Sequence, residues 1–244
     1  MRRHTFHTLY QQRLAAATKP FNARGAKVQR CPYCHIATKY CICEFQPDIE
    51  SPFAVVLLVA DAEILKPSNT GKLILDTIKQ GYCFPWQRIE VADDFLELLK
   101  DPTYQPIIVF PEEYVEDKQR LIAPQPASLT TNKTPLFIFL DGSWREARRM
   151  FRKSPYLDAL PVCSIKPEFV SNYVMRKSDN QDHLATAEVA SLVFEQFGGQ
   201  QEAEVLKHWF AAFRESYMLS KTRIAPDESR PQLGAYTQFI QQLP

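Results

Sequence analysis

The sequence has few of the features by which nucleotide-binding and membrane proteins are recognised. It contains only 7 glycines in 244 residues, and these form neither a GxGxxG fingerprint nor a GxxxxGK[ST] loop. Binding of a dinucleotide, or of a nucleotide in a P-loop, is therefore poorly supported. No apolar run approaches the roughly 18 residues of a membrane span, and the N-terminus lacks the apolar core of a secretory signal. We expect a globular protein that stays in the cytoplasm and does not bind a membrane.

Acidic residues are missing from the first 43 positions. Eight of the 29 Lys and Arg residues lie there, whereas all 28 acidic residues lie in the rest of the chain. A positive arm on an acidic body is what attraction to nucleic-acid phosphates requires. A solvated tail and a mitochondrial transit peptide are the other interpretations of such a start. The arm residues that we predict to bind RNA are Arg2, Arg3, Arg13, Arg24, Lys27 and Arg30.

Four of the 6 cysteines form a C-x2-C-x6-C-x-C pattern. Four thiolates in one short loop are the ligand set of a tetrahedral structural zinc site, and they leave no open position for catalysis. Disulfides are the alternative, but the lack of a secretory signal favours a reducing compartment. A redox C-x-x-C fits less well because it normally follows a strand. The predicted zinc ligands are Cys31, Cys34, Cys41 and Cys43.

Short apolar runs alternate with amphipathic stretches after residue 50. This alternation is typical of an α/β fold with a mostly parallel sheet flanked by helices. We predict a basic arm and zinc-binding segment over residues 1–50 and a catalytic α/β domain over residues 51–244. The predicted strands are 53–60, 106–110, 136–140 and 161–165. The predicted helices are 69–80, with Gly81 as its stop, 93–100, 143–153, 184–197 and 202–219.

The segment 137–153, FIFLDGSWREARRMFRK, places polar residues directly after a strand. Asp141 falls at the edge where open α/β sheets bind their ligands. Ser143 can cap the next helix or receive an anion on its free backbone N–H groups. Trp144 is suited to stacking on a base, but a plain capping turn before a solvated basic helix explains these residues equally well. The helix supplies four more predicted RNA-binding residues: Arg145, Arg148, Arg149 and Arg152.

Two other segments indicate ligand binding. The loop 65–74, LKPSNTGKLI, offers hydroxyl, amide and ammonium donors at a helix start, where Gly71 allows a close approach of the backbone. The segment 171–192 places Tyr173 and Arg176 ahead of a helix with Glu188 in its first turn. Each segment is a weak pattern in isolation.

Taken in order, these segments resemble the DTW-domain family of tRNA-uridine aminocarboxypropyltransferases, which is distantly similar to the SPOUT group of knotted RNA methyltransferases. The resemblance is carried by the cysteine cluster, E-x-x-K-P-S-N-T-G (63–71), D-x-[ST]-W (141–144), Y-x-x-R (173–176) and L-x-T-x-E (184–188). Two positions depart from the family pattern. Ser143 occupies the middle of the namesake tripeptide, and Asp61-Ala62 stand where many members have His-Pro.

The resemblance implies a SPOUT-like fold and leaves open whether the backbone is knotted. It also implies an enzyme that uses S-adenosylmethionine as co-substrate. The implied reaction transfers the 3-amino-3-carboxypropyl group to N3 of a uridine in tRNA and releases methylthioadenosine. Asp141 and Trp144 are the implied catalytic residues, and we predict that Asp141 is the general base. The implied cofactor-binding residues are Lys66, Ser68, Asn69, Thr70, Gly71, Ser143, Tyr173, Arg176, Leu184, Thr186 and Glu188.

Two other functions fit the same residues. A SPOUT-type methyltransferase would share the cofactor and fold but react at the methyl group, so the mass of the product separates the two enzymes. A zinc-containing RNA-binding protein without catalysis would have no affinity for S-adenosylmethionine. For the aminocarboxypropyltransferase we expect tRNA as the partner, and the sequence indicates no obligate protein partner.

Overall fold

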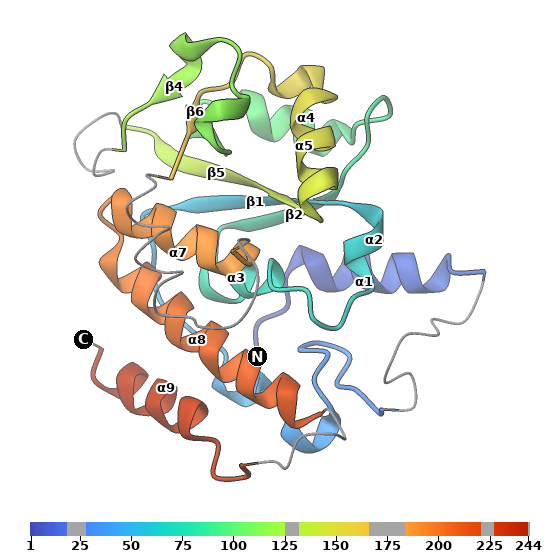
Figure 1. Ribbon diagram of the computed structural model, residues 1–244, viewed down its shortest axis with the longest axis vertical. Helices are drawn as coiled ribbons and strands as arrows, with labels where there is room; N and C mark the ends of the chain where they lie inside the picture. The colour runs from blue at the N-terminus through green and yellow to red at the C-terminus, as the bar shows by residue number, and fades with distance from the viewer. Residues whose placement is uncertain (19–27, 125–131, 166–183, 221–226, 244) are drawn as a thin grey trace.

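A parallel six-stranded sheet forms the centre of the computed structural model, with strand order β2-β1-β5-β3-β6-β4 (Figure 1). The model describes residues 1–18, 28–124, 132–165, 184–220 and 227–243. Every strand pairing is parallel, which confirms the predicted α/β fold. The strands are β1 (Ala54–Val59), β2 (Gly81–Pro85), β3 (Tyr104–Val109), β4 (Leu121–Ile122), β5 (Thr134–Asp141) and β6 (Val162–Cys163).

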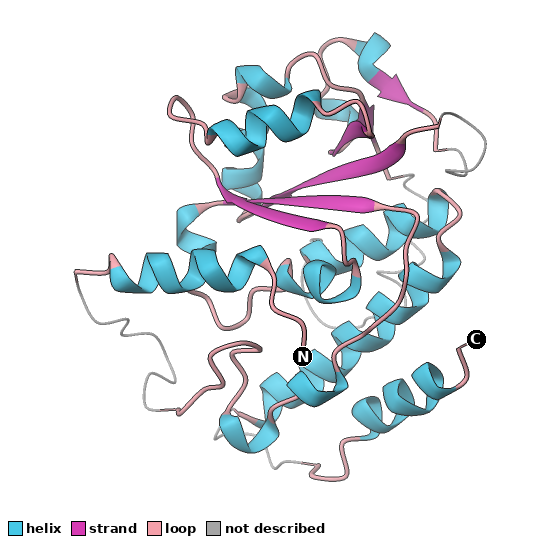
Figure 2. Ribbon diagram, turned by 180° about the vertical axis from the view of Figure 1, so that it is seen from behind, coloured by secondary structure: helices cyan, strands magenta, loops and turns pink. Residues whose placement is uncertain are grey.

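Helices cover both faces of the sheet, as the view from behind also shows (Figure 2). All six residues of β1 are buried, because alternate side chains enter separate cores on the two faces. One face packs against α4 (Asp93–Lys100) and α5 (Trp144–Arg152). The other face packs against α3 (Lys72–Thr77), α7 (Thr186–Gln196) and α8 (Gln200–Leu219). The helix α9 (Pro231–Gln241) lies against α8.

One predicted helix was too long. The helix predicted over 69–80 ends at Thr77, and Gly81 begins β2 instead of terminating a helix. Ile78 already has extended backbone angles, because pairing of 81–85 with β1 outweighs the local helical pattern. The strand predicted at 161–165 shrinks to Val162–Cys163. Residues 166–183, between β6 and α7, lie outside the described part of the chain, and so does any knot formed there.

The N-terminal residues fold onto the body as the helix α1 (Thr5–Ala15), which packs against β2. Phe6 is fully buried in the same core as Cys31 and Ile42. The Arg2 guanidinium donates to the carbonyl of Leu75 (2.8 Å) at the end of α3. The first eighteen residues are therefore not a projecting arm, and the boundary at residue 50 stays a prediction. None of the described helices is long and apolar enough to cross a membrane.

Candidate active site and metal centre

Three of the sequence motifs meet at Asp141, the last residue of β5. Its side chain points to the face of the sheet that α3 and α7 cover, and it is only 3% exposed. The Asn69 amide donates to Oδ2 (2.6 Å), and the Thr186 hydroxyl donates to Oδ1 (2.6 Å). The loop before α3, the end of β5 and the start of α7 are thus held together by one carboxylate.

The loop at 66–71 is built to approach this carboxylate closely. The Asn69 side chain is buried, and its oxygen accepts from the backbone N–H of Lys72 (3.1 Å), which fixes the amide toward Asp141. A Cβ at Gly71 would lie 2.9 Å from the Asp141 Cγ and 2.9 Å from Leu57 Cδ1. Because both neighbours are buried and the backbone angles of Gly71 are ordinary, the position favours glycine for packing and not for an unusual backbone angle.

The environment of Asp141 changes its acidity. Burial raises the pKa of its carboxyl to about 6, against the opposing effect of the hydrogen bonds from Thr186 and Asn69. The nearby Glu63 raises the pKa further, and Lys66 lowers it. A carboxyl with a pKa near 6 is mostly ionised at neutral pH yet more basic than an exposed aspartate, which suits a general base.

Most of the other predicted cofactor-binding residues lie in the two segments that supply Asn69 and Thr186. Lys66 pairs with Glu63, while the hydroxyls of Ser68 and Thr70 make no hydrogen bond within the described part of the chain. Glu188 accepts from the backbone N–H of residue 185 (2.7 Å) and so fixes the first turn of α7. Leu184 lies half-buried just ahead of that helix. Tyr173 and Arg176 lie outside the described residues.

Ser143 and Trp144 are placed differently from Asp141. The backbone N–H and the hydroxyl of Ser143 both donate to Glu146 (2.9 and 2.6 Å) in a capping box at the start of α5. The indole of Trp144 stacks on Phe110 (5.7 Å between ring centroids) and packs against the opposite face of the sheet. The structure therefore does not bring Trp144 and Asp141 together, although they are three residues apart.

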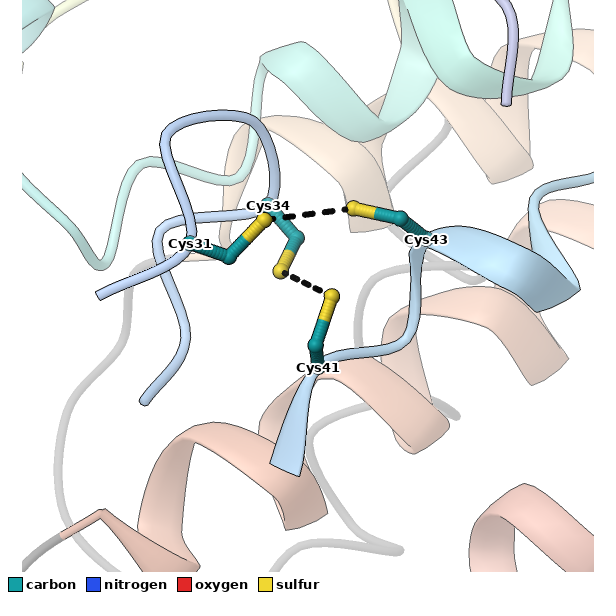
Figure 3. Close-up of side chains that lie close together, drawn as sticks. All are labelled: Cys31, Cys34, Cys41 and Cys43. Carbon is teal, nitrogen blue, oxygen red and sulfur yellow. Dashed lines mark hydrogen bonds between the residues drawn. The ribbon is translucent and has the colours of Figure 1, made fainter. Parts of the chain in front are cut away.

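The four predicted zinc ligands form one cluster (Figure 3). Their Sγ atoms all lie within 4.8 Å of one another, with 3.6 Å between Cys31 and Cys43 and 3.7 Å between Cys34 and Cys41. Tetrahedral zinc with Zn–S bonds of about 2.3 Å holds its sulfurs about 3.8 Å apart. The cluster fits structural zinc.

Some of the predicted RNA-binding residues are exposed to solvent, and others contact residues of the protein itself. Arg145, Arg149 and Arg152 are exposed along α5, and the guanidinium of Arg149 lies over the ring of Trp86 (5.4 Å). Arg148 lies over the ring of Trp144 (5.7 Å).

Four of the predicted RNA-binding arginines near the N-terminus contact other residues of the protein: Arg2, Arg3, Arg13 and Arg30. Arg13 forms a two-bond pair with Asp61 of the short helix α2 (Asp61–Ile64) at 2.6 and 3.0 Å. Arg30 donates to the carbonyl of His35 (3.0 Å), whereas the guanidinium of Arg3 lies over the ring of Tyr33 (5.5 Å). Arg24 and Lys27 lie outside the described residues.

Lys72, which no sequence pattern singles out, lies between the two sites. Its side chain is fully buried, and its ammonium donates to the carbonyl of Cys34 (2.7 Å). Burial lowers the pKa of Lys72 to about 8, while the nearby thiolates and Asp76 raise it, so the ammonium stays mostly protonated at neutral pH. A lysine at a helix start is normally solvent-exposed, and no periodicity in the sequence indicates otherwise.

Comparison with known proteins gives one clear relationship. The family model described as the DTW domain matches residues 28–218, which include the cysteine cluster, the Asp141 site, the helix α7 and all but the last residue of α8. This domain is consistent with a tRNA-modifying function. No solved structure is similar enough to count as a match. Because the model spans well over half of the sequence, the chain belongs to the DTW-domain family.

Proposed function

We propose that this protein transfers the 3-amino-3-carboxypropyl group of S-adenosylmethionine to N3 of a uridine in tRNA and releases methylthioadenosine. The observation that carries the proposal is the convergence of three motifs on one buried carboxylate at the carboxyl end of β5. In parallel α/β sheets this edge is where ligands bind. Membership of the DTW-domain family supports tRNA as the substrate class.

The pocket for S-adenosylmethionine lies, in this proposal, between loop 66–71 and the first turn of α7. The hydroxyls of Ser68 and Thr70 are available to bind polar groups of the donor, and Lys66 provides a positive charge near its carboxylate. When bound, S-adenosylmethionine would supply a γ-methylene that its sulfonium activates for attack. Which carbon reacts depends on which one faces the nucleophile, so the pocket selects transfer over methylation.

Asp141 acts in this proposal as the general base. The imide N3 of uridine is a poor nucleophile until it loses its proton, and a carboxylate with a pKa of about 6 can accept that proton. Each carboxylate oxygen accepts one hydrogen bond from the protein, which leaves lone pairs for the incoming N–H. The N3–C bond forms as the C–S bond breaks, the electron pair passes to sulfur, and Asp141 returns its proton to solvent.

Removal of the Thr186 hydroxyl is expected to shift the pH dependence of the reaction. In Thr186→Val the ionised form of Asp141 loses a hydrogen bond, so its pKa should rise above about 6. The acidic limb of the kcat–pH profile should then move to higher pH by about one unit. Thr77→Val is the matched control, because this buried hydroxyl bonds only to Leu73 within α3 among the described residues. An unmoved limb would remove Asp141 as the titrating base.

The α5 surface is the proposed binding site for tRNA. Arg145, Arg149 and Arg152 face solvent on one helix, and the indoles of Trp86 and Trp144 lie beneath neighbouring guanidinium groups. Arginines provide the phosphate contacts, and the aromatic rings are suited to stacking on unpaired bases. Trp144 thus fits contact with RNA better than contact with the carboxylate of Asp141.

Replacement of the exposed arginines of α5 by glutamine should lower the affinity for tRNA and make that affinity less sensitive to salt. The triple variant Arg145→Gln, Arg149→Gln, Arg152→Gln should lower the slope of log Kd against log salt by up to about 3, or about 1 per phosphate contact. Lys39→Gln, Lys79→Gln, Lys207→Gln removes the same charge from lysines that carboxylates already pair. Equal slopes for the two triple variants, measured by filter binding, would place the tRNA elsewhere.

The co-product of turnover tests the proposed reaction. Incubation of the protein with S-adenosylmethionine should release methylthioadenosine only when unmodified tRNA is present. Release of S-adenosylhomocysteine would instead identify a methyltransferase with the same cofactor. No binding of S-adenosylmethionine in calorimetry would favour the non-catalytic RNA-binding protein.

A further inference from the structure

Lys72 carries a positive charge in a place where none is expected. Its side chain is 1% exposed, and an ammonium removed from water is costly unless anions and hydrogen-bond acceptors surround it. Two acceptors are present: the carbonyl of Cys34 at 2.7 Å and the His35 Nδ1 at 3.1 Å. Because a lysine only donates, that imidazole nitrogen is the acceptor, and the face of Phe213 lies 5.0 Å from the ammonium. None of these groups is an anion.

The anions that act on Lys72 come from two directions. One is Asp76, which is buried and already accepts from the side chains of His4, Gln46 and Trp209 (2.8–3.1 Å). The other is the cysteine cluster, which lies beside the ammonium because Lys72 donates to the carbonyl of the ligand Cys34 (2.7 Å). Four thiolates around one Zn²⁺ carry a net charge of about −2, and no carbonyl or imidazole can neutralise it. A buried cation beside the cluster balances that charge.

The backbone of the same residue reaches the other site. The Lys72 N–H donates to the side-chain oxygen of Asn69 (3.1 Å), and the Asn69 amide donates to Asp141 (2.6 Å). Residues 72–77 form α3, so the two ends of Lys72 connect the cysteine loop to the loop that contacts the carboxylate. The cysteine cluster and Asp141 are therefore linked through one residue.

We propose that Lys72 is the buried counter-ion of the zinc centre, and that through it the zinc centre positions Asn69 against Asp141. Lys72 is a positioning residue, since it contacts neither substrate nor reacting atoms in the proposed reaction. The inference uses the Asp141 site but not the identity of the transferred group. Its test needs neither S-adenosylmethionine nor tRNA, so it can fail while the proposed function stands, and the reverse also holds.

The first test measures how firmly zinc is held. Lys72→Met keeps the length of the side chain but removes its charge, and we expect zinc to be held about 10- to 100-fold more weakly in competition with a chromogenic chelator. The control is Leu75→Ala, a truncation in the same helix whose side chain packs toward Gly81 of β2. This variant should bind zinc as the wild type does. Wild-type affinity in Lys72→Met would show that Lys72 serves Asp76 alone.

The second test begins with the wild-type protein, so its first measurement does not depend on a variant that folds. Removal of zinc by a chelator should increase hydrogen exchange at residues 66–73, while α4 on the opposite face keeps its protection. In Lys72→Met, exchange at 66–73 should already be high and should no longer respond to zinc. An unchanged rate at 66–73 after loss of zinc from the wild type would overturn the link. A rise throughout the chain would show loss of the fold and would equally overturn it.

Discussion

Asp141→Asn is expected to lower kcat by at least about 100-fold, the usual effect of losing a general base, and to leave tRNA affinity unchanged. The side chain is 3% exposed and negatively charged, so it provides no attraction to phosphates that the substitution could remove. An asparagine fits the site, because its oxygen can accept from Asn69 while its amide donates to the Thr186 hydroxyl. Initial rates and filter binding of the same preparations separate the two quantities. Full activity in this variant would assign the base to another residue.

Asp141→Asn is expected to lower activity but not stability. The pKa of Asp141 is about 6 in the folded protein and about 3.9 in an unfolded chain, so between these values the folded state binds more protons. The free energy of unfolding therefore falls as pH rises from about 4 to about 6. Asp141→Asn removes this contribution and should melt at or above the wild-type temperature at pH 7. A variant that loses both activity and stability would indicate a structural role for the carboxylate.

Loss of one zinc ligand is expected to have the largest effect on stability. Cys34→Ser should be purified with much less than one equivalent of zinc, because a hydroxyl is a far poorer ligand than a thiolate. Binding of a structural zinc contributes to folding directly, and each kcal/mol lost lowers the Tm of a protein of this size by about 2–4 °C. We expect a fall of roughly 10 °C or more. The cluster shares its core with Phe6 of α1, so the N-terminal helix should loosen as well.

Cys163→Ser provides the control for this prediction. Cys163 is buried in β6 outside the cluster, and its thiol donates to the carbonyl of Ser164 (3.8 Å). This variant should retain one equivalent of zinc in elemental analysis. One full equivalent in Cys34→Ser, with an unchanged Tm, would contradict a four-cysteine site.

The sequence was most informative where local and tertiary preferences agree. The apolar run of β1, the capped basic helix α5 and the close-spaced cysteines are each explained by neighbours in the chain, and each was predicted. The strand β2 was missed because residues 81–85 are only partly buried and gain their structure by pairing with β1. The sequence predicts α1 only as part of a basic arm, because its many polar residues conceal that Phe6 enters the core.

At the candidate site, the sequence predicted individual motifs but not which of them lie together in space. The motifs around Asn69, Asp141 and Thr186 were recognised one by one, but only the fold shows that one carboxylate joins them. The proximity of Trp144 to Asp141 in sequence was misleading, because the turn after β5 directs the two side chains to opposite faces of the sheet. Lys72 gave no signal, since its burial depends on the cysteine loop that packs over it.

Mass spectrometry of tRNA nucleosides tests the proposed reaction most directly. Unmodified tRNA would be incubated with the purified protein and S-adenosylmethionine that carries ¹³C throughout its aminocarboxypropyl chain and ¹²C in its methyl group. We predict a uridine derivative that contains the complete labelled chain, with unlabelled methylthioadenosine in equal amount. A nucleoside that gains only an unlabelled methyl group, with labelled S-adenosylhomocysteine as the co-product, would contradict the proposal.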